Sequence, residues 1–371
     1  MSDHAGLVLS GGGARTAFQV GVLKAISEWV KTDDCPFKVI TGASAGSINA
    51  AYLAANADQF QSAVDHMLDM WGNLTTRQVY SSELLSKNHA KTLLNVFNHI
   101  RKGMHGVNSL LNALPLAKLL RDQIDFDRIQ RCLDQQFLHS VAVTTTSFQH
   151  SMSTTFVQSN EDIFWERVRR TGIKEKLKVK HLMASTAIPF LFPPVKINNQ
   201  FYGDGSLRNF APLSPAIRCG AKKLVVIGIR ELEDRVIEEK KHISFGDIFS
   251  KILNTILFDS LDIDNERLVR INHTIQHNNS NTTLKNINTV IIRPSIDFRE
   301  LVKAYDYECP VILRQLLRLI GSKNNGEDLK TYLMFEPGYL NALIDQGYKD
   351  AKLHKDAILD QINQTSSNCG V

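Results

Sequence analysis

Short apolar runs alternate along the chain with longer segments whose apolar residues recur at helical spacing, and this pattern predicts alternating strands and helices. The first run, residues 5–10, leads through a glycine turn into a helix expected over 14–30. A second strand, sharp turn and helix are expected over 38–53. Repeated units of this kind predict an α/β fold with a mostly parallel sheet and helices on both faces.

The later part of the chain continues this pattern. Residues 58–139 alternate helical segments with polar breaks; these helices are expected to pack on the core, to form a cap over the site, or to rest on lipid. Strands are expected at 140–146, 153–157, 195–197, 200–202, 223–229 and 289–294. Helices are expected at 211–217, 248–275, 309–320 and 339–353. Sites in such folds lie at the carboxyl ends of the strands.

A serine stands in the sharp turn after the second strand. In the segment Gly42-Ala43-Ser44-Ala45-Gly46, the flanking glycines remove Cβ atoms that would collide with the neighbouring strand and helix. Such a nucleophile elbow forces the serine into a strained backbone conformation and exposes its hydroxyl. Ser44 is therefore a candidate nucleophile; the alternative is a glycine-rich turn with an incidental serine.

Three consecutive glycines, Gly11 to Gly13, follow the first strand and precede its helix. They leave the backbone free to turn several N–H groups toward one point, which suits either a phosphate or an oxyanion. A dinucleotide fingerprint would require glycine at position 16, where Thr16 stands, and a phosphate-loop lysine is absent too. Nucleotide binding is therefore the weaker interpretation, and close packing of the glycines is the remaining alternative.

The third glycine-rich feature is Asp204, which stands between Gly203 and Gly205 at the end of an expected hairpin. The glycines allow the carboxylate to sit on a tight turn close to other backbone, although a simple turn aspartate would have the same neighbours. Because all three glycine-flanked features lie at strand ends, we expect them to share one crevice.

Composition narrows the classes of function. With 371 residues, 43% of them hydrophobic and 22% charged, the chain is of ordinary globular composition. The net charge of +5 is spread over 43 basic and 38 acidic side chains and does not suggest nucleic-acid binding. Five scattered cysteines argue against a disulfide framework or a zinc site. Without a signal sequence or a long apolar run, we expect a cytoplasmic or peripheral membrane protein, with export lacking a cleavable signal left open.

Together these motifs resemble those of the patatin-like phospholipase family, the bacterial branch of the patatin lipid acyl hydrolases. The matching segments are Gly11-Gly12-Gly13-Ala14-Arg15, Gly42 to Gly46, Ala184 to Pro189, and Asp204-Gly205-Ser206 with Asn209 and Pro212 beyond it. They cover about residues 5–230. Thr16 stands where the family usually has glycine, and Ser206 where it usually has glycine or alanine. The resemblance implies a three-layer α/β/α fold with added cap and C-terminal helices.

The resemblance also implies a chemistry that requires neither a cofactor nor a metal. Ser44 would attack an ester carbonyl of a phospholipid or lysophospholipid, and Asp204 would take its proton and later activate water. The implied oxyanion hole is the loop of Gly11, Gly12, Gly13, Ala14 and Arg15, and the implied acid turn is Gly203, Gly205 and Ser206. Arg15 would hold that loop or meet a lipid phosphate.

Alternatives remain open for the mechanism and for the role of the protein. A histidine-assisted triad would need a histidine after the acid, and His242, His273, His277 and His354 are available, whereas His181 precedes it. The same dyad could serve an esterase of soluble esters or a regulated effector that degrades membranes. A noncatalytic member that binds lipid or a partner is the third alternative.

Three regions are expected from this interpretation. Residues 1–230 would form the catalytic domain, with 58–139 as its helical insertion. Residues 231–363 would form a C-terminal helical extension with one late strand, packed on the core. Residues 364–371 would form a disordered tail.

Overall fold

The computed structural model describes residues 4–30, 32–82, 109–231, 260–277, 284–319 and 326–363. Part of the expected helical insertion, the beginning of the helix expected over 248–275, His242 and the tail at 364–371 lie outside these residues.

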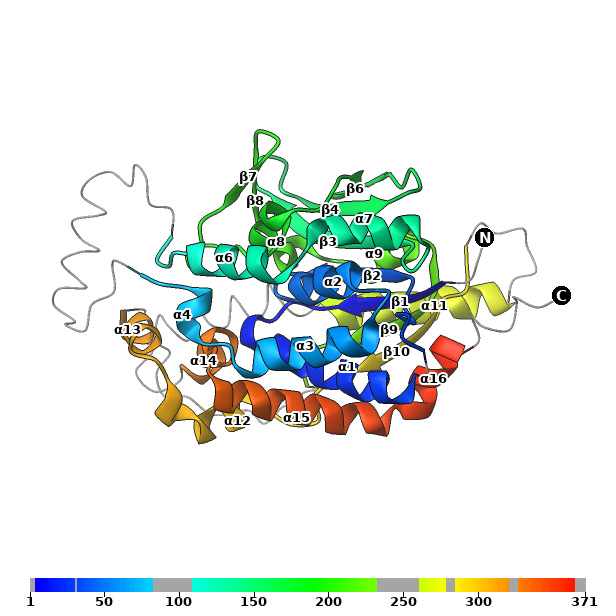
Figure 1. Ribbon diagram of the computed structural model, residues 1–371. Helices are drawn as coiled ribbons and strands as arrows, with labels where there is room; N and C mark the ends of the chain where they lie inside the picture. Colours follow the sequence, from blue (N-terminus) through cyan, green and yellow to red (C-terminus); the bar gives the residue numbers. More distant parts are fainter. Residues whose placement is uncertain are drawn as a thin grey trace.

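A mixed sheet, ten-stranded over the described residues, forms the centre of the molecule (Figure 1). Neighbouring parallel strands lie in the order β10 (Asn288–Ile292), β9 (Ala221–Ile227), β1 (His4–Leu9), β2 (Val39–Ala43) and β3 (Ser140–Ser147). Antiparallel β4 (Met152–Ser159), then β6 (Arg170–Lys174) and β5 (Trp165–Arg167), complete the other edge. The predicted α/β class with a mostly parallel sheet is confirmed, whereas β5 and β6 were not expected from the sequence.

A hairpin brings one further strand onto β3. Strands β7 (Val195–Ile197) and β8 (Gln200–Gly203) are joined by Asn198 and Asn199, which both adopt positive φ. Asparagine tolerates this conformation better than most residues, which explains the tight turn. Strand β8 runs antiparallel to the end of β3, with Gly203 opposite Thr146. The residue that follows β8 is therefore delivered to the carboxyl end of a central strand.

Apolar side chains cover both faces of the sheet because successive residues of a strand point to opposite sides. Leu7 and Leu9 of β1 belong to the larger buried cluster, whereas Val8 belongs to a second one. The larger cluster includes residues of α1 (Ala17–Trp29), α2 (Gly46–Ala55), α3 (Phe60–Gly72) and α15 (Pro337–Leu353). The second includes residues of α9 (Ser214–Arg218) and α11 (Ser260–His277). The expected three layers of helix, sheet and helix are therefore present.

Several shorter helices surround these layers. In the expected insertion they are α4 (Thr76–Val79), α6 (Leu114–Gln123) and α7 (Phe126–Asp134), and α8 (Val179–Ser185) follows later. The C-terminal region adds α12 (Phe298–Ala304), α13 (Val311–Leu319), α14 (Glu327–Leu333) and α16 (Lys355–Asn363). Pro115 stands in the first turn of α6, where its missing N–H is not needed. Helix α6 packs against α4 and α8, close to the site described below.

Helix α15 lies along α1 in backbone-to-backbone contact (Figure 1). A Cβ atom added to Gly21 of α1 would lie 1.8 Å from the carbonyl oxygen of Ile344. A Cβ added to Gly347 of α15 would lie 2.0 Å from the carbonyl oxygen of Phe18. Only glycine at these two positions allows the helices to approach so closely. The described C-terminal helices therefore share the core of the preceding sheet.

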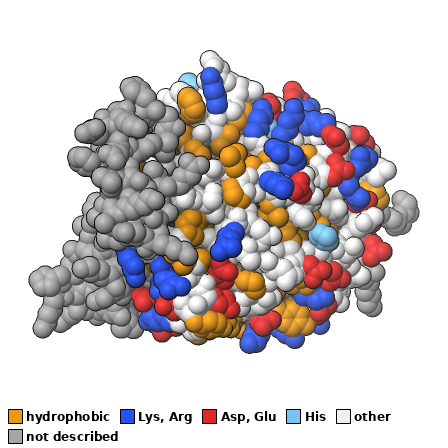
Figure 2. All heavy atoms as spheres, turned by 60° about the vertical axis from the view of Figure 1, so that its left-hand side comes forward, with side chains coloured by type: hydrophobic (Ala, Val, Ile, Leu, Met, Phe, Trp, Pro, Cys, Tyr) orange, Lys and Arg blue, Asp and Glu red, His pale blue; other side chains and the backbone are white. Residues whose placement is uncertain are grey.

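Basic and acidic side chains are intermixed on the face of the molecule in Figure 2. This distribution agrees with the small net charge of the chain. Over the described residues, every helix is too short or too polar to cross a membrane.

Candidate active site

Ser44 lies in the turn between β2 and α2, and its backbone has a φ of 49°. This left-handed conformation costs a non-glycine residue about 1–3 kcal/mol and persists only where neighbours impose it. A Cβ on Gly42 would lie 2.5 Å from the Gly46 carbonyl oxygen, and one on Gly46 would lie 2.5 Å from the Leu9 carbonyl oxygen. The two glycines thus allow the close packing that an elbow requires.

A second serine, Ser185 at the end of α8, holds this strained turn. The Ser44 N–H donates a 2.9 Å hydrogen bond to Ser185 Oγ, whose hydroxyl in turn donates to the Thr144 carbonyl at 2.7 Å. All three residues are buried. The Ser44 backbone is therefore tied to β3, and its N–H is already satisfied in this arrangement.

Asp204 faces Ser44 from the end of the β7–β8 hairpin. The Ser44 hydroxyl donates to Asp204 Oδ2 at 2.6 Å, and the Ser206 N–H donates to Oδ1 at 2.8 Å. Thr146 Oγ1 on β3 donates to the Asp204 carbonyl at 2.8 Å. Both oxygens of the carboxylate and its backbone are therefore held, and Oδ2 is aimed at the serine hydroxyl.

Burial controls the ionisation of this carboxyl group. Asp204 is completely buried, and the loss of hydration raises its pKa from 3.8 to about 6. Hydrogen bonds from Ser44 and Ser206 act in the opposite direction because they stabilise the carboxylate. The group is consequently a stronger base than an exposed aspartate but is still mainly ionised at neutral pH.

The glycine loop after β1 lies against both residues. A Cβ on Gly11 would lie 2.6 Å from Ser44 Cβ and 2.5 Å from Ser206 Oγ, so a larger residue does not fit between them. Gly13 has a φ of 55° and lines a pocket together with Ser44. The Arg15 N–H donates to the Gly12 carbonyl at 3.1 Å in a short 3-10 helix, Gly13–Thr16. Within the implied oxyanion loop, the Arg15 N–H is therefore already used.

The Arg15 side chain points away from the site toward the C-terminal region. Its guanidinium lies over the Tyr332 ring, 4.0 Å from the centroid, and its Nε donates to Thr331 Oγ1 at 2.8 Å. Asp328 Oδ1 lies 4.0 Å from the same guanidinium, and the Arg15 side chain is only 6% exposed. Of the two expected roles, this position corresponds to holding the loop rather than to meeting a lipid phosphate.

The two departures from the family pattern have local explanations. Thr16 is buried, and its hydroxyl donates to the Gly13 carbonyl at 2.6 Å, which stabilises the turn of the glycine loop. Ser206 contributes both its N–H and its hydroxyl to the Asp204 carboxylate. Neither side chain blocks the glycine loop, since each bonds to a neighbouring group.

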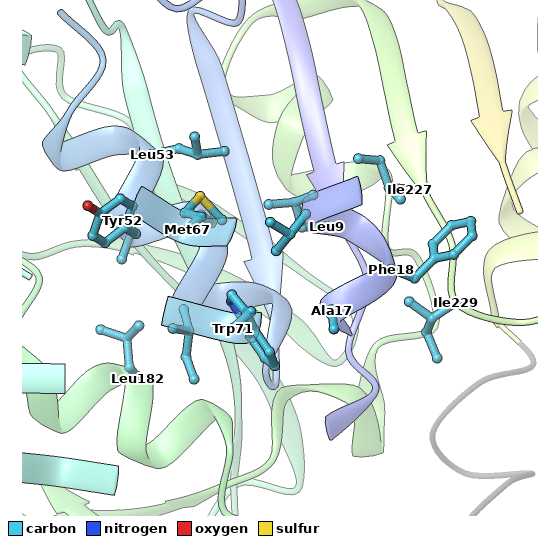
Figure 3. Packing of buried hydrophobic residues seen from close by; sticks show 14 of the residues in the cluster. Leu9, Ala17, Phe18, Tyr52, Leu53, Met67, Trp71, Leu182, Ile227 and Ile229 are labelled. Atoms are coloured by element: carbon cyan, nitrogen blue, oxygen red, sulfur yellow. The ribbon is translucent and has the colours of Figure 1, made fainter. Parts of the chain in front are cut away.

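An apolar pocket opens beside Ser44. Its walls come from α3, α6, α8, the loop before β7, and the end of α14 with the residues just after it. The lining includes Trp71, Leu116, Met183, Phe192 and Leu333. Figure 3 shows Trp71 in the buried cluster that extends to Leu9 of β1. A pocket of this composition suits a hydrocarbon chain better than a polar substrate.

A second crevice lies on the other side of the glycine loop. It is lined by Gly11 and Ser206, by residues at the carboxyl ends of β1, β2, β9 and β10, and by Arg230 and Arg293. Arg293 forms an ion pair with Asp262, and its side chain is 13% exposed. The crevice therefore places guanidinium groups beside the same loop that borders Ser44.

Three of the candidate histidines, His181, His273 and His277, contact groups other than Ser44. The buried ring of His181 accepts a 2.9 Å hydrogen bond from the Lys178 N–H through Nδ1 and lies against Phe156. His273 and His277 stack on each other along α11, and both are exposed. The geometry therefore favours Asp204, rather than any of these histidines, as the partner of Ser44.

The structure thus brings together three features that are distant in sequence: the glycine loop, Ser44 and the Asp204 turn. Ser185 lies in the segment 184–189 that carries part of the family resemblance, but its bond to the Ser44 N–H is not evident from the sequence. Thr331 and Tyr332, which contact the glycine loop from the C-terminal region, were not expected from the sequence. No motif marks those two residues, and only their position against Arg15 reveals them.

A protein-family model and a curated protein match the sequence of this chain. A family model described as patatin-like phospholipase matches residues 7–217. A curated protein of Invertebrate iridescent virus 6, described as probable lipid hydrolase 463L, is 25% identical over 221 residues, which cover 58% of this chain and 64% of that protein. The match therefore spans less than two thirds of that relative.

Solved structures are similar at lower identity. Human GIVD cytosolic phospholipase A2 aligns with a TM-score of 0.45 at 10% identity, over 98% of this chain and 60% of that chain. VipD from Legionella pneumophila aligns with a TM-score of 0.39 at 12% identity, over 96% and 67% of the two chains.

Proposed function

The chain belongs to the patatin-like phospholipase family, and we propose that it is a serine hydrolase that cleaves carboxylic ester bonds of phospholipids or lysophospholipids. The observation that carries this proposal is the 2.6 Å hydrogen bond from the Ser44 hydroxyl to the buried Asp204 carboxylate, beside an apolar pocket. A strained serine paired with a base of raised pKa is an arrangement suited to nucleophilic attack.

The reaction proceeds in two halves. Ser44 Oγ forms a bond to the ester carbonyl carbon as its proton passes to Asp204 Oδ2, and the carbonyl oxygen becomes an oxyanion. Backbone N–H groups of Gly12 and Gly13 stabilise this charge. The carbon–oxygen bond to the alcohol then breaks, the alcohol leaves with the proton from Asp204, and an acyl-enzyme remains. Asp204 then takes a proton from water as the water oxygen bonds to the acyl carbon. The bond from that carbon to Ser44 Oγ breaks, Oγ takes the proton back from Asp204, and the fatty acid leaves.

The apolar pocket and the crevice with two arginines, both beside the glycine loop, favour a substrate that carries an acyl chain and a phosphate group. The fatty acyl chain occupies the apolar pocket, because burial of each methylene there is favourable by about 0.8 kcal/mol. The alcohol portion extends toward the crevice with Arg230 and Arg293, whose guanidinium groups suit a phosphate. This arrangement favours a phospholipid substrate over an uncharged soluble ester.

Two exposed apolar side chains support contact with a membrane surface. Leu114 at the start of α6 and Phe190 are each 70% exposed, although the residues around them line the apolar pocket. The Leu110 N–H donates to the Phe190 carbonyl at 2.9 Å, which keeps the two segments together. Apolar side chains of this kind insert between lipid headgroups, so the protein docks peripherally with its pocket toward lipid.

The decisive experiment measures fatty acid release from defined phospholipids and lysophospholipids by mass spectrometry. Ser44→Ala and Asp204→Asn should each lower kcat by roughly 1,000-fold or more. His181→Gln should retain most activity, because the His181 ring contacts Phe156 and the Lys178 N–H rather than Ser44. Labelling of Ser44 by an organophosphonate separates this proposal from a noncatalytic lipid-binding role. Full activity in Asp204→Asn, or an unlabelled Ser44 in folded protein, would contradict the proposal.

Paired substrates separate a phospholipase from an esterase of soluble or uncharged esters. Lysophosphatidylcholine and monoacylglycerol with the same acyl chain differ only in the group that would meet the arginines. We expect Arg293→Gln to raise KM for the phosphate-bearing lipid while leaving the monoacylglycerol nearly unchanged. Equal effects on both lipids would favour the esterase alternative.

A further inference from the structure

The C-terminal segment around α14 contacts the site although it lies far beyond the family match. The match ends at residue 217, whereas α14 covers Glu327–Leu333 and leads into Met334 and Phe335. Tyr332, Leu333 and Phe335 all line the apolar pocket that contains Ser44. This wall of the pocket is therefore supplied by the C-terminal region.

The same segment is wedged against the glycine loop. A Cβ on Gly13 would lie 2.2 Å from the Tyr332 carbonyl oxygen, so the two backbones are in direct contact. Thr331 Oγ1 accepts the 2.8 Å hydrogen bond from Arg15 Nε and itself donates to the Asp328 carbonyl. The Arg15 guanidinium also stacks over the Tyr332 ring, which adds a cation–π contact between the loop and this segment.

Two hydrogen bonds from the segment 76–80 hold the backbone of this pocket wall in place. The Tyr80 hydroxyl donates to the Leu333 carbonyl at 2.8 Å, and the Thr76 hydroxyl donates to the Phe335 carbonyl at 3.2 Å. Leu333 is 2% exposed and Phe335 is 6% exposed. Their side chains are therefore held in place by the backbone beneath them, and they form a firm boundary to the pocket.

We propose that residues 331–335 select the length of the acyl chain and, through Thr331 and Arg15, position the oxyanion loop. This inference rests on the proposed hydrolase function and assigns to the C-terminal region a part in both substrate choice and turnover. Leu333 and Phe335 are the specificity-determining residues, and Arg15 and Thr331 are positioning residues that act through the loop.

The test for chain selection is a series of saturated lysophosphatidylcholines from octanoyl to stearoyl, hydrolysed by the full-length protein. Leu333→Ala and Phe335→Ala enlarge the pocket, so the preferred chain should lengthen by about two to three carbons in the leucine variant. Each methylene newly buried should raise kcat/KM about fourfold. Chain lengths that overfill the wild-type pocket should gain most.

Leu329→Ala is the matched control, because Leu329 is equally buried on α14 but is not part of the pocket lining. It should lower thermal stability without moving the preferred chain length. If folded Leu333→Ala and Phe335→Ala both keep the wild-type profile, the wall does not select chain length. If the wild-type protein hydrolyses no ester at all, the proposed function fails instead, so the two failures are distinguishable.

The positioning role is tested with a short-chain ester, p-nitrophenyl butyrate, after titration of active sites with an organophosphonate. Thr331→Val removes the acceptor for Arg15 Nε, and we expect kcat per titrated site to fall about tenfold with KM nearly unchanged. Thr331→Ser keeps the hydroxyl and should restore kcat. A Thr331→Val enzyme with wild-type kcat per site, or a Thr331→Ser enzyme as slow as Thr331→Val, would overturn this role.

Discussion

The buried carboxyl group of Asp204 should determine the pH range of activity. It accepts the Ser44 proton only in its ionised form, and burial raises its pKa to about 6. We therefore expect kcat/KM to fall as the pH drops through about 6, measured with an uncharged ester whose own ionisation does not interfere. An acid limb near pH 4 would indicate a hydrated carboxylate and would contradict the buried geometry.

The same pKa shift predicts a stability cost. Because the folded pKa lies above the unfolded value of 3.8, this group favours folding at low pH, and that contribution is lost as the pH rises through about 6. Asp204→Asn should therefore be more stable than the wild type at pH 8, by up to about 3 kcal/mol, since one pKa unit corresponds to about 1.4 kcal/mol. Denaturant unfolding at pH 8 and pH 4 tests this; the difference should shrink at the lower pH, and a less stable variant at pH 8 would refute it.

The Ser206 side chain should lower the pKa of the Asp204 carboxyl group. The hydroxyl and the N–H of Ser206 both stabilise the Asp204 carboxylate and so lower its pKa. In Ser206→Ala the N–H bond remains and the hydroxyl is lost, so the acid limb of kcat/KM should move to higher pH. A limb that moves to lower pH, in a protein with unchanged circular dichroism, would rule out this role for the hydroxyl.

The contact of α1 with α15 depends on glycines at the two points where the backbones meet. Gly347→Ala would place a Cβ 2.0 Å from the Phe18 carbonyl oxygen, and backbone atoms cannot yield to it cheaply. We expect a loss of about 1–3 kcal/mol in the free energy of unfolding, measured by denaturant titration.

Gly338→Ala on the same helix provides the control. The close atoms there belong to the Glu308 carboxylate, with Oε1 2.2 Å from the added Cβ. This side chain can move away, but it then loses the hydrogen bonds that it accepts from the Gly338 and Tyr339 N–H groups. We expect a cost of about 1 kcal/mol, smaller than that of Gly347→Ala. Equal costs for the two variants would mean that α1 and α15 separate easily and do not depend on the glycine contact.

For the molecule as a whole, the C-terminal helices should be needed for folding of the region that carries the site. Helix α15 covers α1, and Tyr332 supports the glycine loop, so a fragment ending at residue 231 would expose both. We expect this fragment to aggregate or remain unfolded by circular dichroism and size-exclusion chromatography, next to a folded full-length control. A folded, active fragment would show that residues 1–230 form an independent domain.

Much of the architecture was predictable because its signals are local. The apolar runs at 5–10 and 140–146 became β1 and β3, and the glycine turn at Ser44 separates β2 from α2. Elements with weak apolar patterns were missed, such as β5, of which only Trp165 is buried. Helix α9 begins at Ser214 rather than at residue 211, because Pro215 rather than Pro212 stands in its first turn.

The sequence by itself determined which residues could do chemistry. Glycines beside Ser44, beside Asp204 and at positions 11–13 constrain the backbone within a few residues, and such constraints can be recognised without a fold. The family resemblance drawn from those motifs is confirmed by the family match over residues 7–217.

Only the tertiary structure decided how these residues meet. Ser44 and Asp204 are 160 positions apart, and Arg15 and Thr331 are 316 apart. Their contacts depend on the order of the strands, on the antiparallel pairing of β8 with β3, and on the packing of α15 against α1. Such long-range contacts are set by the sum of many packing interactions, so no local pattern in the chain encodes them.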